Sequence, residues 1–150
     1  ILSQREIEAR YIVDLQEYTM RIQIEARTLG DISRNHIIPT AINYQNTLIK
    51  NVRGLKEIYG NEFKKHATEQ MSIIERISEH VAAINSGVNF MISSRKKANE
   101  INDPHKKAIE YSKKVLTKMD LIRYHCDKLE LLVDNTLWPL AKYRELLFSC

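Results

Sequence analysis

The chain has 150 residues, of which 43% are hydrophobic and 28% are charged, and its formal net charge is +4. That length is typical of one domain and supplies enough apolar side chains for a core. Only four glycines and three prolines interrupt it, which favours long helices over a turn-rich β-sandwich. The net charge is too small to predict nucleic-acid binding, because polyanion-binding proteins concentrate basic side chains on one face.

Membrane and secretion signals are absent from the sequence. No apolar run reaches the length of about eighteen residues that a membrane span needs, and no signal peptide is recognisable. Cys126 and Cys150 do not suggest a disulfide framework, and Cys126 falls on an apolar helical position, where a small buried side chain is expected. The chain begins with Ile1 and its helical periodicity is under way by Ile7. We therefore expect a piece of a longer polypeptide.

The first predicted helical segment runs from about Gln4 to Tyr59. Its apolar or small residues recur at steps of three and four, as on one face of a helix. Pro39 removes one hydrogen bond and presses on the carbonyl of Asn35, so we expect a kink there, since the periodicity continues in phase on both sides. Gly60 ends the segment. The predicted buried positions are Tyr11, Leu15, Tyr18, Ile22, Ala26, Leu29, Ile32, His36, Thr40, Tyr44, Leu48, Val52 and Leu55.

The second predicted segment runs from about Glu62 to Ile101, and its buried positions follow a strict 4-3 spacing. Asn102, Asp103 and Pro104 then form a stop and a restart, with Asp103 as the N-cap and Pro104 at the first helical position of the next helix. The predicted buried positions are Phe63, Ala67, Gln70, Ile74, Ile77, Val81, Ile84, Val88, Met91, Arg95 and Ala98.

The third predicted segment runs from Pro104 to about Val133, again with 4-3 spacing. An apolar loop, Leu137–Leu140, follows it, and Lys142–Phe148 is predicted as a short final helix. The predicted buried positions are Ala108, Tyr111, Val115, Met119, Ile122, Cys126, Leu129 and Val133.

These segments predict an all-α fold. Short connections make the three long helices antiparallel neighbours, so residues 1–150 are expected to form a single antiparallel three-helix bundle domain, with the first helix kinked near Pro39 and a short C-terminal helix. The first segment is longer than its two partners. Part of it must therefore fold back or meet something outside this chain.

Catalytic and metal-binding patterns find no support. None of the five histidines has a glutamate three residues before it, which excludes the Glu-x-x-His pattern of bundle di-metal sites. His125 and Cys126 are consecutive on a helix and point about 100° apart, so the imidazole cannot act as a base on the thiol. His80 and His125 sit beside buried positions and are interpreted as satisfied border residues. The sequence predicts no catalytic, cofactor-binding or metal-binding residue.

Two polar features have alternative interpretations. The lysine pairs Lys96-Lys97, Lys106-Lys107 and Lys113-Lys114 are interpreted as a solvated end of the bundle and not as a contact for nucleic acid or an acidic partner, because few aromatic side chains interleave them. A second set surrounds Pro39 and is expected to form a hydrogen-bonded layer that compensates the carbonyls freed by the proline. Its members are Asn35, His36, Asn43, Gln45 and Asn46.

Several long motifs of the chain resemble one family. Arg27–Asp31 followed by Asn35–Ala41 and Tyr44–Asn46 resembles the C-terminal region of type III glutamine synthetases. Arg123–Glu130 and the ending Leu137–Leu140 with Lys142–Phe148 do so too, and the resemblance covers essentially the whole chain in order. Ala141 departs from it, since a proline is expected there.

The resemblance implies that the parent is a cytoplasmic, ATP-dependent ligase that condenses glutamate with ammonia through γ-glutamyl phosphate, uses Mg²⁺ or Mn²⁺, and assembles from stacked hexameric rings. Its catalytic and nucleotide-binding residues lie in an earlier domain and match no position here. Two functions remain open. The chain is either a structural domain that packs on the catalytic domain or on neighbouring subunits, or a regulatory module that binds a ligand or a partner. We do not expect the isolated chain to be an enzyme.

Overall fold

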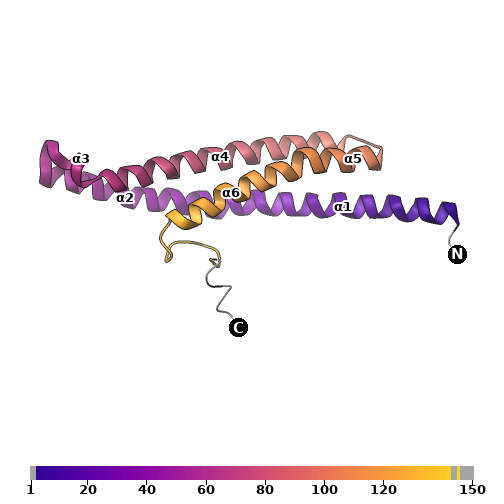
Figure 1. Cartoon of the computed structure of the whole chain (residues 1–150), viewed down its shortest axis with the longest axis horizontal. Coiled ribbons are helices and arrows are strands. Elements are labelled where there is room, and N and C mark those ends of the chain that lie inside the picture. Colours follow the sequence, from indigo (N-terminus) through magenta and orange to yellow (C-terminus); the bar gives the residue numbers. More distant parts are fainter. Residues whose placement is uncertain (1–2, 143–144, 146–150) are drawn as a thin grey trace. The chain divides into compact units, whose positions relative to one another are not determined.

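The computed structural model describes residues 3–142 and Glu145, and every regular element in this part of the chain is helical (Figure 1). No helix among these residues is both long enough and apolar enough to cross a membrane. In chain order the elements are α1 (Gln4–Ile32), the π-helical turn η1 (Ser33–Ile37), α2 (Ile38–Tyr59), the 3₁₀ turn η2 (Gly60–Glu62), α3 (Phe63–His66), α4 (Thr68–Asn99), α5 (Pro104–Glu110), the π-helical turn η3 (Tyr111–Leu116) and α6 (Thr117–Leu132).

Capping hydrogen bonds and a glycine mark the ends of several of these helices, and the sequence predicts two of these ends. Ser3 and Glu6 form reciprocal hydrogen bonds at the start of α1, with the Ser3 backbone N–H donating to Glu6 Oε2 over 2.6 Å. Gly60 ends α2 with a positive φ of 57°, a backbone conformation that residues other than glycine rarely adopt. The Asp103 carboxylate accepts a hydrogen bond from the Lys106 backbone N–H over 2.9 Å, and Pro104 follows it. The predicted cap of the third segment is therefore confirmed.

Helical structure continues across Pro39. The π-turn η1 lies immediately before α2, and Pro39 occupies the first turn of α2. The Ile38 backbone N–H donates to the Ser33 carbonyl, five residues earlier, as the π pattern requires. The second π-turn, η3, interrupts the third segment at a place where the sequence predicts nothing unusual.

The chain forms two compact units, each assembled from segments that are distant in the sequence. The first unit combines Ile1–Asp31 with Ser86–Arg123, and the second combines Ile32–Asn85 with Tyr124–Cys150. The assignment of residues 1–150 to a single domain stays a prediction.

In the first unit, small residues allow helices to approach closely. A Cβ on Gly30 of α1 would lie 3.4 Å from Met91 Cε, and a Cβ on Gly87 of α4 would lie only 2.9 Å from Ile122 Cγ1. The fully buried Tyr111 donates a hydrogen bond to Asn99 Oδ1 over 2.6 Å, so the largest side chain of this core also has its polar atom satisfied.

In the second unit, the end of α6 is covered by the loop that follows it. Trp138 is buried, in agreement with the predicted apolar loop. The ammonium of the buried Lys142 donates to the carbonyls of Glu130 and Val133 over 2.7 and 3.1 Å, which satisfies acceptors left free at the C-terminal end of the helix. The predicted helix Lys142–Phe148 lies mostly outside the described residues.

The predicted core register is right for two segments and partly wrong for the first. Every predicted position of the second segment is buried or half-buried, and every predicted position of the third is buried. In the first segment Tyr11, Tyr18 and His36 are exposed, which corrects the prediction. Beyond Ala26 the buried residues lie one position later than predicted, because the chain buries the small residues Gly30 and Ser33 in place of the neighbouring Leu29 and Ile32. The buried residues are Gly30, Ser33, Ile37 and Ala41.

Candidate functional site

Much of the polar stretch around Pro39 faces away from the core. His36, Asn43 and Asn46 are exposed, because the register places Ile37 and Ala41 toward the core in the positions expected for His36 and Thr40. The buried position predicted for His36 is therefore wrong, whereas the compensation of the carbonyls freed by Pro39 stays a prediction.

One member of the stretch does join two helices of the second unit. The half-buried Gln45 donates from Nε2 to the Ile74 carbonyl over 2.9 Å and to Ser78 Oγ over 2.7 Å. Six residues further along α2, Asn51 Oδ1 accepts a hydrogen bond from Gln70 Nε2 over 3.1 Å. These side-chain amides connect α2 to α4 and have a structural role.

Two histidines face each other in the second unit. His80 Nδ1 and His125 Nδ1 are 3.0 Å apart and share one hydrogen bond, which confirms their interpretation as satisfied border residues. Burial is the main cause that lowers the pKa of His80, and the charge of His125 is the next largest. Arg76 and Lys128 act in the same direction, whereas Glu79 opposes them. The pair therefore favours the neutral imidazole at His80.

Cys126 has the environment of a structural thiol. It is buried, as predicted, and its Sγ is 3.9 Å from the buried Ser33 Oγ. Burial raises the pKa of the Cys126 thiol to about 11, which leaves very little thiolate at neutral pH. This environment gives the side chain no nucleophilic role.

No group of three or more metal-ligating side chains occurs among the residues that the structure describes.

The predicted lysine cluster divides into two environments. Lys106 and Lys113 are exposed, whereas Lys107 is half-buried and lines a pocket in the first unit with Gln23 and Asn99. Sequence reasoning missed this distinction, because neighbouring lysines look alike in a sequence.

The N-terminal half of α1 contributes little to the core of the first unit. Between Ser3 and Tyr18 only Leu15 is even half-buried. Three apolar residues of α1 are strongly exposed. They are Val13, Met20 and Ile24, which expose 49%, 58% and 58% of their surface. At about 100° per residue they share one side of α1, roughly opposite the buried Ile22 and Ala26. We call Val13, Met20 and Ile24 the second stripe of α1.

Comparison with known proteins identifies the kind of chain that carries these features. Residues 1–56 match the family model of the glutamine synthetase C-terminal domain. The chain is 41% identical over 150 residues to a glutamine synthetase of Bacteroides fragilis (strain YCH46), covering 99% of this chain and 21% of that protein. It is 26% identical over 149 residues to a type-3 glutamine synthetase of Dictyostelium discoideum, covering 99% of this chain and 20% of that protein.

A glutamine synthetase of Butyrivibrio fibrisolvens is 24% identical over 149 residues, covering 99% of this chain and 21% of that protein. The chain is thus a helical relative of the glutamine synthetases, and it spans about a fifth of the length of the curated relatives it matches. More particularly, its first 56 residues are similar to the glutamine synthetase C-terminal domain, and one of its relatives is a type-3 enzyme.

Proposed function

We propose that this chain is a non-catalytic C-terminal helical domain of a type III glutamine synthetase, and that it packs on the catalytic domain or on neighbouring subunits of a homo-oligomer. The parent would make glutamine from glutamate, ammonia and ATP in the cytoplasm, with Mg²⁺ or Mn²⁺ as the metal. In this proposal its catalytic, nucleotide-binding and metal-binding residues lie outside this chain. The second stripe of α1 carries the proposal.

The stripe is suited to packing because it is apolar and regularly spaced. Val13, Met20 and Ile24 recur at i, i+7 and i+11, the spacing at which a helix packs against another helix or into a groove. Single exposed apolar residues are normal on protein surfaces, but an aligned set opposite an already buried face is a feature of interfaces. Burial of each side chain would stabilise the contact by roughly 1.5–3 kcal/mol.

The proposed arrangement of α1 and α4 in the first unit is antiparallel. Gly30 lies near Val88 and Met91, whereas Thr19 lines a pocket with Asn99. Residue numbers that rise along α1 therefore meet numbers that fall along α4, which supports the predicted bundle.

The same order supports an antiparallel arrangement of α2 and α4 in the second unit. Gln45 bonds to Ile74 and Ser78, and Asn51 bonds to Gln70. The proposed kink near Pro39 is supported by η1, since π-turns and prolines are the common causes of helix kinks.

The test replaces Val13 and Ile24 together by glutamate in the full-length protein. Leu131→Glu serves as the control, because Leu131 is 79% exposed and belongs to the second unit, whereas the stripe belongs to the first. Hydrogen exchange of residues 13–24 is compared between the full-length protein and the isolated chain, and oligomeric mass is measured by sedimentation. We expect α1 to be protected in the full-length protein, and the double variant to lose that protection or the assembly while the control keeps both. Equal exchange in both contexts, with an unchanged assembly in the double variant, would overturn the proposal.

A second candidate function is the regulatory ligand- or partner-binding module. The observation that favours it is the pocket beside Lys107.

A further inference from the structure

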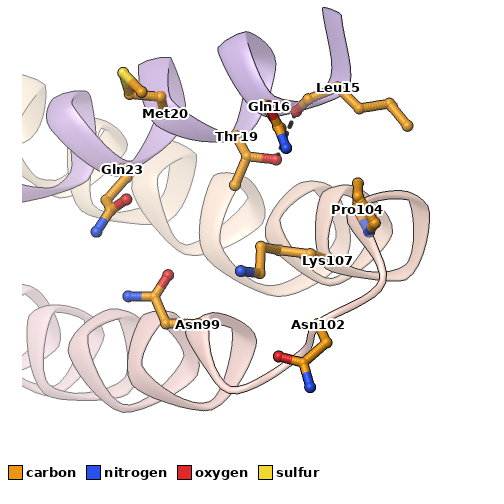
Figure 2. Close-up of a pocket in the computed structure, with 9 residues that line it drawn as sticks. All are labelled: Leu15, Gln16, Thr19, Met20, Gln23, Asn99, Asn102, Pro104 and Lys107. Carbon is orange, nitrogen blue, oxygen red and sulfur yellow. Dashed lines mark hydrogen bonds between the residues drawn. The ribbon is translucent and has the colours of Figure 1, made fainter. Parts of the chain in front are cut away.

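A pocket of about 200 Å³ lies within the first unit, between the middle of α1, the end of α4 and the start of α5 (Figure 2). Pockets for drug-sized ligands usually range from about 300 to 1,000 Å³, so this one suits a smaller molecule. Six of its nine lining residues have polar side chains. The polar lining residues are Gln16, Thr19, Gln23, Asn99, Asn102 and Lys107.

The polar groups of the pocket have unused hydrogen-bonding capacity. Tyr111 donates to Asn99 Oδ1 over 2.6 Å, which holds the Asn99 amide in place and leaves its NH₂ group to donate elsewhere. Thr19 Oγ1 donates to the Leu15 carbonyl over 2.8 Å, so its oxygen can still accept. Figure 2 shows the Lys107 and Gln23 side chains extending toward the space beside Asn99.

The charge of the pocket favours an anion. None of the nine lining residues is acidic, and Lys107 brings the one positive charge of the lining. Among the described residues, no carboxylate lies within ion-pair distance of Lys107, whereas the neighbouring Lys114 pairs with Glu110. Lys107 is also half-buried, so its charge is less screened than that of a fully exposed lysine. A carboxylate placed here would gain an ion pair and hydrogen bonds from amide groups.

The apolar part of the lining limits the ligand further. Leu15 and Pro104 border the polar groups and offer contact to a short hydrocarbon chain. We propose that this pocket binds a small aliphatic carboxylate, with the carboxylate on Lys107 and Asn99 and the carbon chain against Leu15 and Pro104. This proposal does not depend on the docking role of the second stripe, although Met20 of the stripe also lies at the edge of the pocket.

The test measures the reactivity of individual lysines in the full-length protein. An amine-acylating reagent is added with increasing succinate or butyrate at constant ionic strength, and the acylation of each lysine is read by peptide mass spectrometry. Butyramide, which has no charge, is the control ligand. At a concentration of ten times the dissociation constant, we expect about tenfold slower acylation of Lys107, because only the unoccupied fraction reacts. The adjacent, exposed Lys106 is the internal reference and should not change.

Substitutions then test whether the protection comes from the pocket. Gln23→Ala should weaken the carboxylate protection of Lys107, and Lys107→Met should abolish the binding of succinate and butyrate by calorimetry. Lys106→Met, the matched control, should leave both intact. The proposal is overturned if neither carboxylate slows acylation of Lys107 at millimolar concentration, or if butyramide protects Lys107 equally well. It is also overturned if Lys107→Met binds succinate and butyrate as tightly as the unsubstituted protein does. None of these outcomes bears on the second stripe, which is tested through Val13 and Ile24.

Discussion

At the scale of single residues, Gly87 lies at a close approach between α4 and α6 in the first unit. An alanine Cβ at this position would lie 2.9 Å from Cγ1 of Ile122, which is fully buried and cannot easily move. We expect Gly87→Ala to destabilise the protein, because overpacking costs about 1–3 kcal/mol and outweighs a gain of about 1 kcal/mol in helix propensity.

Gly54 provides the matched control for this substitution. It is also helical, and nothing lies within 4 Å of the position of its added Cβ. Gly54→Ala should therefore show only the helix-propensity gain of up to about 1 kcal/mol. Urea unfolding of both variants gives the two free energies of unfolding. Equal stability of the two variants would show that the close approach at Gly87 has no energetic consequence.

The pair of His80 and His125 predicts a loss of stability on mild acidification. The pKa of His80 is lowered in the folded state by burial and by His125, so the unfolded chain binds more protons. The associated stability is present above the unfolded pKa of about 6.5 and is lost as the pH falls below it. Thermal unfolding from about pH 8 to about pH 5 measures this dependence.

Replacing His125 tests the origin of that dependence. In His125→Gln the second imidazole is gone, so the stability should decline less steeply below about pH 6.5. His105→Gln, a substitution outside the pair, should leave the slope unchanged. A slope in His125→Gln that equals the parent's would contradict a role for the pair.

At the scale of secondary-structure elements, η1 predicts where the long first segment tolerates a deletion. A π-turn contains one residue more than an α-turn, and the step from Ser33 to Ile37 crosses it. Deleting the exposed His36 leaves a step of three, which an ordinary α-helix accommodates with Ile37 still facing the core. Pro39 would then lie inside a continuous α-helix, which costs up to about 3 kcal/mol, so we expect the variant to be destabilised, but less than a variant whose deletion also changes the register of α2.

Deletion of Asn46 is the control, since it is exposed and lies in the regular α2. It shortens the segment equally but rotates everything after it by about 100°. Leu48, Val52 and Leu55 would leave their half-buried positions, at roughly 1.5–3 kcal/mol for each fully buried side chain and less for partial burial. Chemical unfolding compares the two deletions, and equal destabilisation would mean that η1 does not absorb the missing residue.

At the scale of the whole molecule, the sequence predicts the helices better than it predicts their faces. The second and third segments carry apolar residues at a regular 4-3 spacing, so their buried faces follow from periodicity alone. In the first segment the helices meet at Gly30 and Ser33, whereas hydrophobicity favours the neighbouring Leu29 and Ile32. The shift in register begins at Gly30, where a hydrophobicity pattern gives no reason to bury a glycine, so it could not be read from the sequence.

The candidate sites, too, could be predicted from the sequence only in part. His80 and His125 are 45 residues apart in sequence, and only folding brings their rings together. The pocket depends on the difference between Lys106 and Lys107, which periodicity does not resolve. The second stripe consists of residues off the main apolar face of α1, and it becomes visible only when their exposure is measured.

The division into two units has a consequence for any attempt to shorten the protein. The boundaries between the units fall at residues 31/32, 85/86 and 123/124, near the end of α1 and inside α4 and α6. Each unit therefore consists of two stretches separated along the chain, and no single cut releases either of them intact. A terminal truncation that reaches past one boundary removes part of both, so limited proteolysis should trim the ends of the chain without yielding a stable half.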